Sequence, residues 1–228
     1  MPLDPALTEL TTVSQASPTV EFTDFVTRTG FVTFYAAKTT DLNVLTQSDF
    51  YSDTVTTSIL NQNPTEFTKM LDLDFDIEFK ETGDVRGTGT VNVPVMMVIH
   101  NSSKTHSSYV IVKVRHWDGS TETDLVTNQS DTWIETSTGT NEVHKAMFGI
   151  DVVIPERHFA EGDTLRLTVE LWGDSTDSGG NGDWVLGHDP KNRGTTPRES
   201  LGGSGNATAL DFGSEPTILL FKCPFKVE

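Results

Sequence analysis

Hydrophobic and charged residues alternate most regularly at residues 71–80. The apolar residues there occupy every second position: Leu71, Leu73, Phe75, Ile77 and Phe79. Successive side chains of a strand point to opposite faces, so this pattern predicts a strand with one buried face and one hydrated face. Four acidic residues lie on the hydrated face. We interpret them as solvated rather than as a calcium site, because neighbours on one strand face lie about 7 Å apart.

Shorter apolar or alternating runs follow one another along the rest of the chain after residue 18. Residues 91–99 are apolar at nearly every position, which predicts a strand buried on both faces with Pro94 at a bulge or bend. One helical turn is expected near Pro64. The other predicted strands lie at residues 20–23, 31–36, 51–60, 109–117, 146–154, 165–172 and 217–227.

These segments amount to eight to eleven short strands without interleaved long helices, which predicts an all-β fold. The 34 threonines agree with it, because β-branched residues favour strands over helices. We expect a jelly-roll sandwich or barrel of about eight or more antiparallel strands with long loops. Residues 1–18 are predicted to form an N-terminal arm. Residues 19–228 are predicted to form one β domain with a long glycine-rich loop at residues 173–216.

The charge of the chain is strongly unbalanced, with 16 Lys+Arg against 33 Asp+Glu and a net charge of -17. Such a surface repels phosphate groups, so neither nucleic acid nor direct insertion into a membrane is expected. No apolar run approaches the ~20 residues of a membrane span, and the first residues do not resemble a secretory signal. We therefore expect synthesis in a host cytoplasm without a signal peptide. The acidic excess is also compatible with a high-salt habitat.

The best candidate for a metal site is the loop at residues 174–183. It combines glycines with three carboxylates, those of Asp174, Asp177 and Asp183. Calcium prefers such oxygen ligands on a flexible backbone. A solvated hairpin tip has the same composition, so both interpretations stand. Apart from this possible calcium ion, no cofactor is expected.

The sequence shows no assembled active site. Its six histidines have none of the spacings that zinc ligands adopt. His188 and Asp189 follow a strand-like run at residues 184–186 and could serve catalysis, but a turn before Pro190 explains them equally well. Residues 202–206 lack the G-x-S-x-G spacing of a nucleophile elbow. The four tryptophans are expected to fill the core or a subunit contact, with a sugar-stacking platform as the alternative. We therefore predict that the chain is not an enzyme.

Cys223 is the only cysteine, and it precedes Pro224 in the last predicted strand. Proline lacks a backbone donor and suits an edge or a bulge, so Cys223 is expected near the border of the sheet. A lone cysteine can form a disulfide between two chains under oxidising conditions. It can equally serve as a small buried apolar group.

The length, acidity, threonine-rich strands and solitary cysteine resemble the major capsid proteins of icosahedral viruses of halophilic archaea. Those proteins are single vertical jelly rolls, and residues 159–167 (FAEGDTLRL) are similar to strand entries in many jelly rolls. The resemblance implies a capsid subunit of the virion shell that binds other virion proteins, either copies of itself or a sister capsid protein. Two alternatives remain: a carbohydrate-binding, lectin-like β-sandwich module, and a decoration or turret protein of a tailed virus.

Overall fold

The computed structural model describes residues 20–24, 29–38, 43–48, 57–175, 181–190, 198–200 and 217–226. These residues form β-strands and the turns between them, without any helix. Accordingly, the described part of the chain holds no helix long and apolar enough to cross a membrane. The prediction of an all-β sandwich with eight or more mainly antiparallel strands is confirmed. The predicted arm at residues 1–18 lies outside the described residues.

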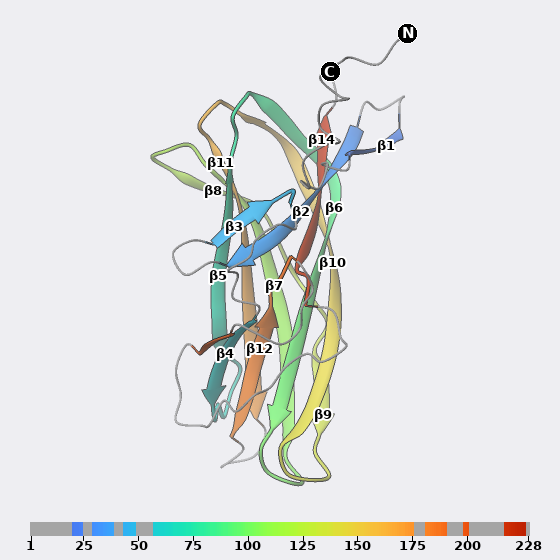
Figure 1. Cartoon of the computed structure of the whole chain (residues 1–228), viewed down its shortest axis with the longest axis vertical. Coiled ribbons are helices and arrows are strands. Elements are labelled where there is room, and N and C mark those ends of the chain that lie inside the picture. Colours follow the sequence, from blue (N-terminus) through green and yellow to red (C-terminus); the bar gives the residue numbers. More distant parts are fainter. Residues whose placement is uncertain are drawn as a thin grey trace, which may run out of the picture.

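The strands differ greatly in length, and the longest of them, β6, β7, β10 and β11, run along the long axis of the molecule (Figure 1). In chain order the strands are β1 (Val20–Asp24), β2 (Thr29–Lys38), β3 (Asn43–Thr46), β4 (Thr57–Gln62), β5 (Thr68–Glu78), β6 (Gly83–Ile99), β7 (Thr105–Trp117), β8 (Glu122–Gln129), β9 (Trp133–Thr136), β10 (Glu142–Phe159), β11 (Thr164–Ser175), β12 (Gly182–Gly187), β13 (Arg198–Ser200) and β14 (Leu220–Lys226).

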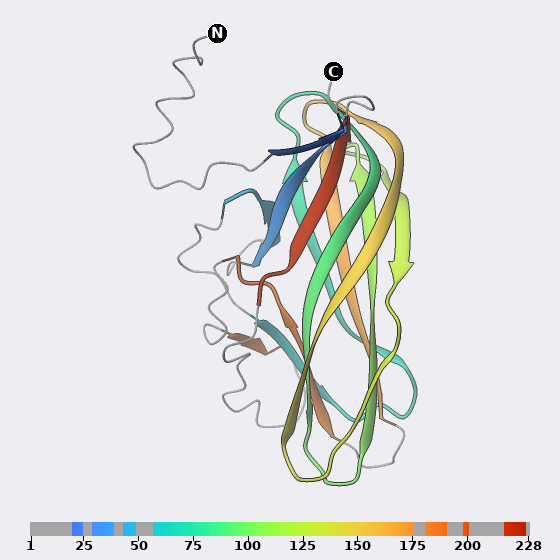
Figure 2. The same cartoon turned by 90° about the vertical axis from the view of Figure 1, so that its right-hand side faces the viewer.

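The strands form two layers that we call the β6 sheet and the β11 sheet. The β6 sheet contains β13, β4, β12, β6, β10, β14, β2 and β1, and the β11 sheet contains β3, β5, β11, β7, β8 and β9. The hairpin of β2 and β3 connects them. All pairings among the described strands are antiparallel except β13 with β4 and β3 with β5. Figure 2 shows β14, β6 and β10 side by side in front of β11 and β7.

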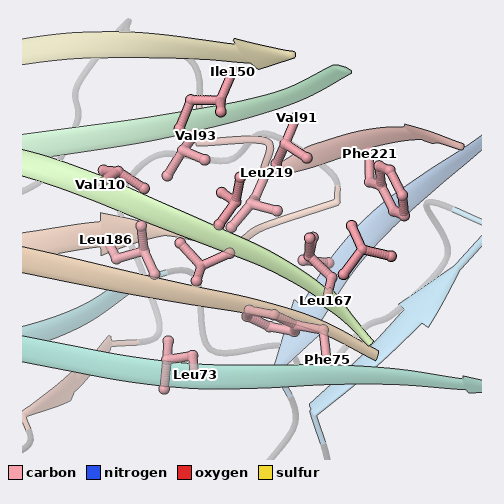
Figure 3. Packing of buried hydrophobic residues seen from close by; sticks show 14 of the residues in the cluster. Leu73, Phe75, Val91, Val93, Val110, Ile150, Leu167, Leu186, Leu219 and Phe221 are labelled. Atoms are coloured by element: carbon pink, nitrogen blue, oxygen red, sulfur yellow. The ribbon is translucent and has the colours of Figure 1, made fainter. Parts of the chain in front are cut away.

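The core lies between the two sheets, where side chains from both layers meet (Figure 3). The alternation predicted at residues 71–80 is confirmed on β5, where Leu71, Leu73 and Phe75 are buried while Asp72 is exposed. Burial of each large apolar side chain contributes about 1.5–3 kcal/mol to folding. The inward residues of β6, β10, β12 and β14 supply the opposing surface from the other sheet.

Strand β6 is buried on both faces along its second half, as its continuous apolar sequence predicts. Every residue from position 93 to position 99 is buried. Pro94 keeps its register opposite Met147 of β10, so no bulge occurs on that side. On the other side, β14 pairs with β6 as far as Asn92 and β12 pairs from Val95 onward. Pro94 therefore lies where the neighbouring strand changes, and its missing backbone donor is tolerated there.

Two sequence-based expectations about local structure are wrong. The expected loop at residues 173–216 contains β12, which pairs with both β4 and β6, and its Trp184, Val185 and Leu186 are fully buried. The run 184–186 is strand-like, but three apolar residues are too few to establish a strand period, so the sequence assigns the segment to the loop. No helical turn forms near Pro64. Instead, the Pro64 carbonyl accepts a hydrogen bond of 3.0 Å from the Ser175 backbone N–H.

Cys223 lies in the interior of the β6 sheet rather than at its border. Strand β14 is flanked by β2 and β6, and the Cys223 side chain is fully buried. The expected bulge does occur, since the register with β6 shifts between Lys222 and Phe225. Burial raises the pKa of the thiol well above its ordinary value. Cys223 thus acts as a small apolar group, and a disulfide between chains would require β14 to open.

Candidate functional site

The outer face of the β11 sheet carries a continuous set of polar and aromatic side chains. Residues that point away from the core alternate along β11, beginning with Arg166 and ending with Asp174. Arg166 donates two hydrogen bonds, of 2.7 and 2.8 Å, to the Asp76 carboxylate on β5. It also donates a bond of 2.7 Å to Glu122 on β8. The bonds to Asp76 are the main cause of a raised pKa for the Arg166 guanidinium.

The cations of this face neutralise the acidic row that the sequence predicts on β5. Arg115 on β7 lies 2.8 Å from Asp124 and 3.2 Å from Glu122. Asp74 accepts a hydrogen bond from the Thr168 hydroxyl and lies 3.7 Å from Arg166. We call this set the ion-pair ladder: Asp74, Asp76, Arg115, Glu122, Asp124 and Arg166. The acidic face is therefore bound to its neighbours across the strands rather than simply solvated.

Glu170 connects the ladder to a group of aromatic side chains. The Lys113 ammonium donates a hydrogen bond of 2.6 Å to Glu170, and the Trp172 indole donates one of 2.9 Å. The Lys69 ammonium lies 3.6 Å away. Burial of Glu170 opposes its ionisation, but the hydrogen bonds from Lys113 and Trp172 outweigh this effect and lower its pKa. Glu170 is therefore a fully partnered carboxylate that fixes the Trp172 ring.

We call Phe67, Tyr109 and Trp172 the aromatic row. The Tyr109 and Trp172 rings are nearly parallel, with 10° between their planes and 5.9 Å between their centroids. The Phe67 centroid lies 4.9 Å from that of Tyr109, and Phe67 is 39% exposed. Burial, together with the Glu170 charge, raises the pKa of the Tyr109 hydroxyl, which stays neutral at physiological pH. The row is thus a half-exposed apolar surface next to charged groups.

Asp174 ends the outward row of β11, two residues after Trp172. Its Oδ1 is buried and has no hydrogen-bond partner among the described residues. Asp183 belongs to β12 in the β6 sheet, where it is fully buried with its Oδ2 3.2 Å from His100 Nε2. The structure does not bring the predicted calcium ligands Asp174 and Asp183 together, and Asp177 lies outside the described residues. Among described residues, no three His, Cys, Asp or Glu side chains could jointly hold a metal ion.

The predicted catalytic residues, His188 and Asp189, directly follow β12. Both residues are fully buried. The His188 ring lies 6.0 Å from that of Phe75, and the Asp189 backbone N–H donates to the Thr217 carbonyl. Trp184 is also fully buried and stacks on His106. Burial keeps these side chains from solvent, whereas the outward face of the β11 sheet carries partly exposed side chains such as Phe67.

His116 forms a second polar cluster, at the turn between β10 and β11. The Arg157 Nε–H donates to His116 Nδ1 over 2.8 Å, so this nitrogen carries no proton. His116 Nε2 then donates to Asp163 Oδ2 over 2.7 Å. The Ala160 backbone N–H also donates to Asp163, and these two bonds, Ala160 first, lower the pKa of the carboxyl. Both ring nitrogens are occupied, so the cluster stabilises the turn rather than offering a base.

We expect Asp163→Asn to reduce the loss of stability in acid. The folded-state pKa of Asp163 lies below its unfolded value of about 4, so its stabilising effect is complete above that pH. The effect disappears as the pH falls through the folded pKa. Urea midpoints at pH 7, 5 and 3 should therefore fall less steeply for the variant, from a lower starting value. Glu161→Gln, an exposed position in the same turn, is the control. Equal slopes for wild type and Asp163→Asn would contradict the assignment.

Solved structures resemble this chain at very low sequence identity. The sequence itself matches no protein-family model and no curated protein. An α-amino acid ester hydrolase has a TM-score of 0.50 and 9% identity, over 85% of this chain and 36% of its own. A CocE/NonD family hydrolase from Staphylococcus aureus has a TM-score of 0.48 and 10% identity, and the match covers 87% of this chain and 37% of the hydrolase. The VP2 protein of infectious bursal disease virus has a TM-score of 0.31 and 11% identity, and the match covers 99% of this chain and 40% of VP2.

This chain spans about two fifths or less of the length of each of these structures. At such identities the likeness shows the fold alone. The prediction of a structural virion protein that is not an enzyme is contradicted, because the likeness that reaches a TM-score of 0.50 is to a hydrolase. The likeness to a viral capsid protein is limited to a TM-score of 0.31, and none of the three points to halophilic archaea. Acidity and threonine-rich strands are compatible with a β-sandwich of any function, which explains the error.

Proposed function

We propose that this chain is the substrate-holding β-sandwich of a hydrolase that acts on small amino-acid derivatives, and that the aromatic row and Asp174 form the binding surface. The observation that carries the proposal is the buried Asp174 Oδ1, which accepts no hydrogen bond from the described residues. A buried acceptor without a donor costs about 1–3 kcal/mol. A ligand with an ammonium group would supply that donor next to Trp172.

The charges of the chain favour the same class of ligand. An α-amino acid ester is a cation at neutral pH, because its carboxyl group is esterified and its amino group is protonated. The net charge of -17 attracts such a cation and repels anions. The free amino acid released by hydrolysis is a zwitterion without net charge, so the surface would hold the product less tightly than the substrate.

The aromatic row accounts for the remaining part of the ligand. The exposed edge of Phe67 and the half-buried rings of Tyr109 and Trp172 offer apolar area for an aliphatic or aromatic side chain. Glu170 is already bonded to Lys113 and Trp172, so it holds the row in place. Asp174 is the carboxylate left to select the ammonium group. The likeness to an α-amino acid ester hydrolase supports this choice of substrate class.

The test is calorimetric titration with phenylalaninamide, a cation that resembles the ester but is hydrolysed slowly. We expect weak binding, and we expect Asp174→Asn to lower the affinity at least tenfold, since a hydrogen bond to a charged group is worth about 1.5–3 kcal/mol. Asp124→Asn, on the same outer face but in the ion-pair ladder, is the control and should bind normally. N-acetylphenylalaninamide, which lacks the charge, should not bind. Absent binding of the cation, or equal binding by wild type and Asp174→Asn, would overturn the proposal.

A further inference from the structure

Strand β10 presents an exposed row of side chains on the outer face of the β6 sheet. Of the two faces of β10, the inner one turns buried residues such as Ile150 and Val152 toward the core. The other face is exposed throughout residues 143–153. Its members, which we call the β10 row, are Val143, Lys145, Met147, Gly149, Asp151 and Val153. Figure 2 shows β10 as the outermost strand of its sheet, next to β6.

The β10 row is unusually apolar for a chain of this charge. Five large hydrophobic side chains are exposed among the described residues, and three of them belong to this row. Val143 is 42% exposed, Met147 46% and Val153 63%. Exposed apolar side chains gathered on one surface, rather than scattered singly, indicate an interaction site. The outer face of the neighbouring β6 adds Thr88, Thr90 and Asn92, which are uncharged.

The order of residues in the row makes it complementary to itself. A two-fold axis through the row between Met147 and Gly149 places Val143 opposite Val153 of a second copy. The same axis places Lys145 opposite Asp151 and Met147 opposite Gly149. Each apolar side chain then faces an apolar one or a glycine, and each charge faces its opposite. Moving the axis by one residue would set Lys145 against Val153, or Val143 against Asp151, so one register is favoured.

We infer that a second copy of this chain binds the β10 row, and that the two rows pack face to face and antiparallel about this axis. Addition of a strand to the free edge of β10 is less suitable, because the Asn128 side chain of β8 already donates a hydrogen bond of 2.6 Å to the Asp151 carbonyl. Packing through the outer face leaves that bond intact. It also removes the exposed valines and methionines of both copies from water at once.

The dimer is expected to be of modest strength. A stable interface buries about 1,600 Å² in total, and β6 can add only Thr88, Thr90 and Asn92 to this row, because it is buried on both faces from residue 93 onward. Two copies with a net charge of -17 each also repel one another. Salt at about 0.15 M limits the repulsion to charges within about 8 Å. The contact between Lys145 of one copy and Asp151 of the other then decides the register, because a symmetric dimer contains this contact twice.

The test is analytical ultracentrifugation of the whole chain at 0.15 M salt and about 100 µM protein. Wild type should sediment with about twice the 25.0 kDa of one chain. Lys145→Asp and Asp151→Lys should each weaken the dimer about tenfold or more, because each creates two like-charge contacts per dimer. An equal mixture of the two variants should restore it, since every contact in the mixed dimer pairs opposite charges. Thermal unfolding of both variants confirms that they are folded.

The control is Lys80→Asp, which makes the same charge change at a side chain that is 79% exposed outside the β10 row. This variant should dimerise like wild type. A monomeric wild-type chain would overturn the inference, and so would an unchanged dimer in Lys145→Asp. Two monomeric single variants whose mixture stays monomeric would also overturn it, because the proposed register requires the mixture to associate.

Discussion

Phe75→Asp is expected to leave the chain unfolded at 25 °C. The Phe75 side chain is fully buried between the two sheets, where Figure 3 shows it beside Leu73 and Leu167. Removing a buried phenylalanine costs about 3–5 kcal/mol. A carboxylate at this position would in addition be buried without a cation, which costs several kcal/mol more. The sum is comparable to the whole stability of a typical domain, about 5–15 kcal/mol.

The matched control for this variant is Asp74→Asn, one residue earlier on β5. Asp74 is on the outer face, with 41% of its side chain exposed, and its nearest cation is Arg166 at 3.7 Å. An exposed pair of this kind contributes about 0–1 kcal/mol, so circular dichroism should give a melting temperature near that of wild type. Equal effects of the two replacements would contradict the assignment of the faces of β5.

The sequence was sufficient to predict the elements whose pattern is local. Alternation over a full strand identified β5 and its buried face, and a long apolar run identified β6 as a strand buried on both faces. Strand β12 is assigned to a loop by its sequence, although residues 184–186 are strand-like, because glycines typical of a loop flank this short run. Its burial depends on β4 and β6, which are distant in sequence. Pairing over such distances leaves no periodic signal within a short strand.

The candidate site could be predicted only in part for the same reason. Glu170, Trp172 and Asp174 alternate on one strand, so their common face could be inferred from the sequence. Their contact with Tyr109 and Phe67 depends on the register of β11 with β7 and β5, which the pattern does not determine. Asp174 and Asp183 belong to one predicted loop and are nine positions apart in the sequence. The chain crosses from one sheet to the other between them, which separates the two groups.

Gly89→Ala is expected to destabilise the chain strongly, although it adds a single methyl group. A Cβ at Gly89 would lie 2.5 Å from the Lys222 carbonyl oxygen and 3.0 Å from Pro224 Cδ. The obstacle is the backbone of β14 at its bulge, where the register with β6 shifts after Lys222. A backbone held by pairing with both β2 and β6 cannot yield easily. We therefore expect a loss of about 3 kcal/mol, the upper end of the range for overpacked sites.

Gly149→Ala is the control, because Gly149 also lies within a strand that pairs with β6. A Cβ there would meet only the Asn92 side-chain oxygen, at 3.6 Å, which is an ordinary contact. Alanine restricts the unfolded chain more than glycine does, so this variant should be unchanged or up to about 1 kcal/mol more stable. Urea unfolding at low protein concentration, where any dimer dissociates, measures both variants. If Gly89→Ala proved as stable as Gly149→Ala, β14 would not be held against β6 at this bulge. The close approach of Cys223 and Pro224 to β6 would then not depend on glycine at position 89.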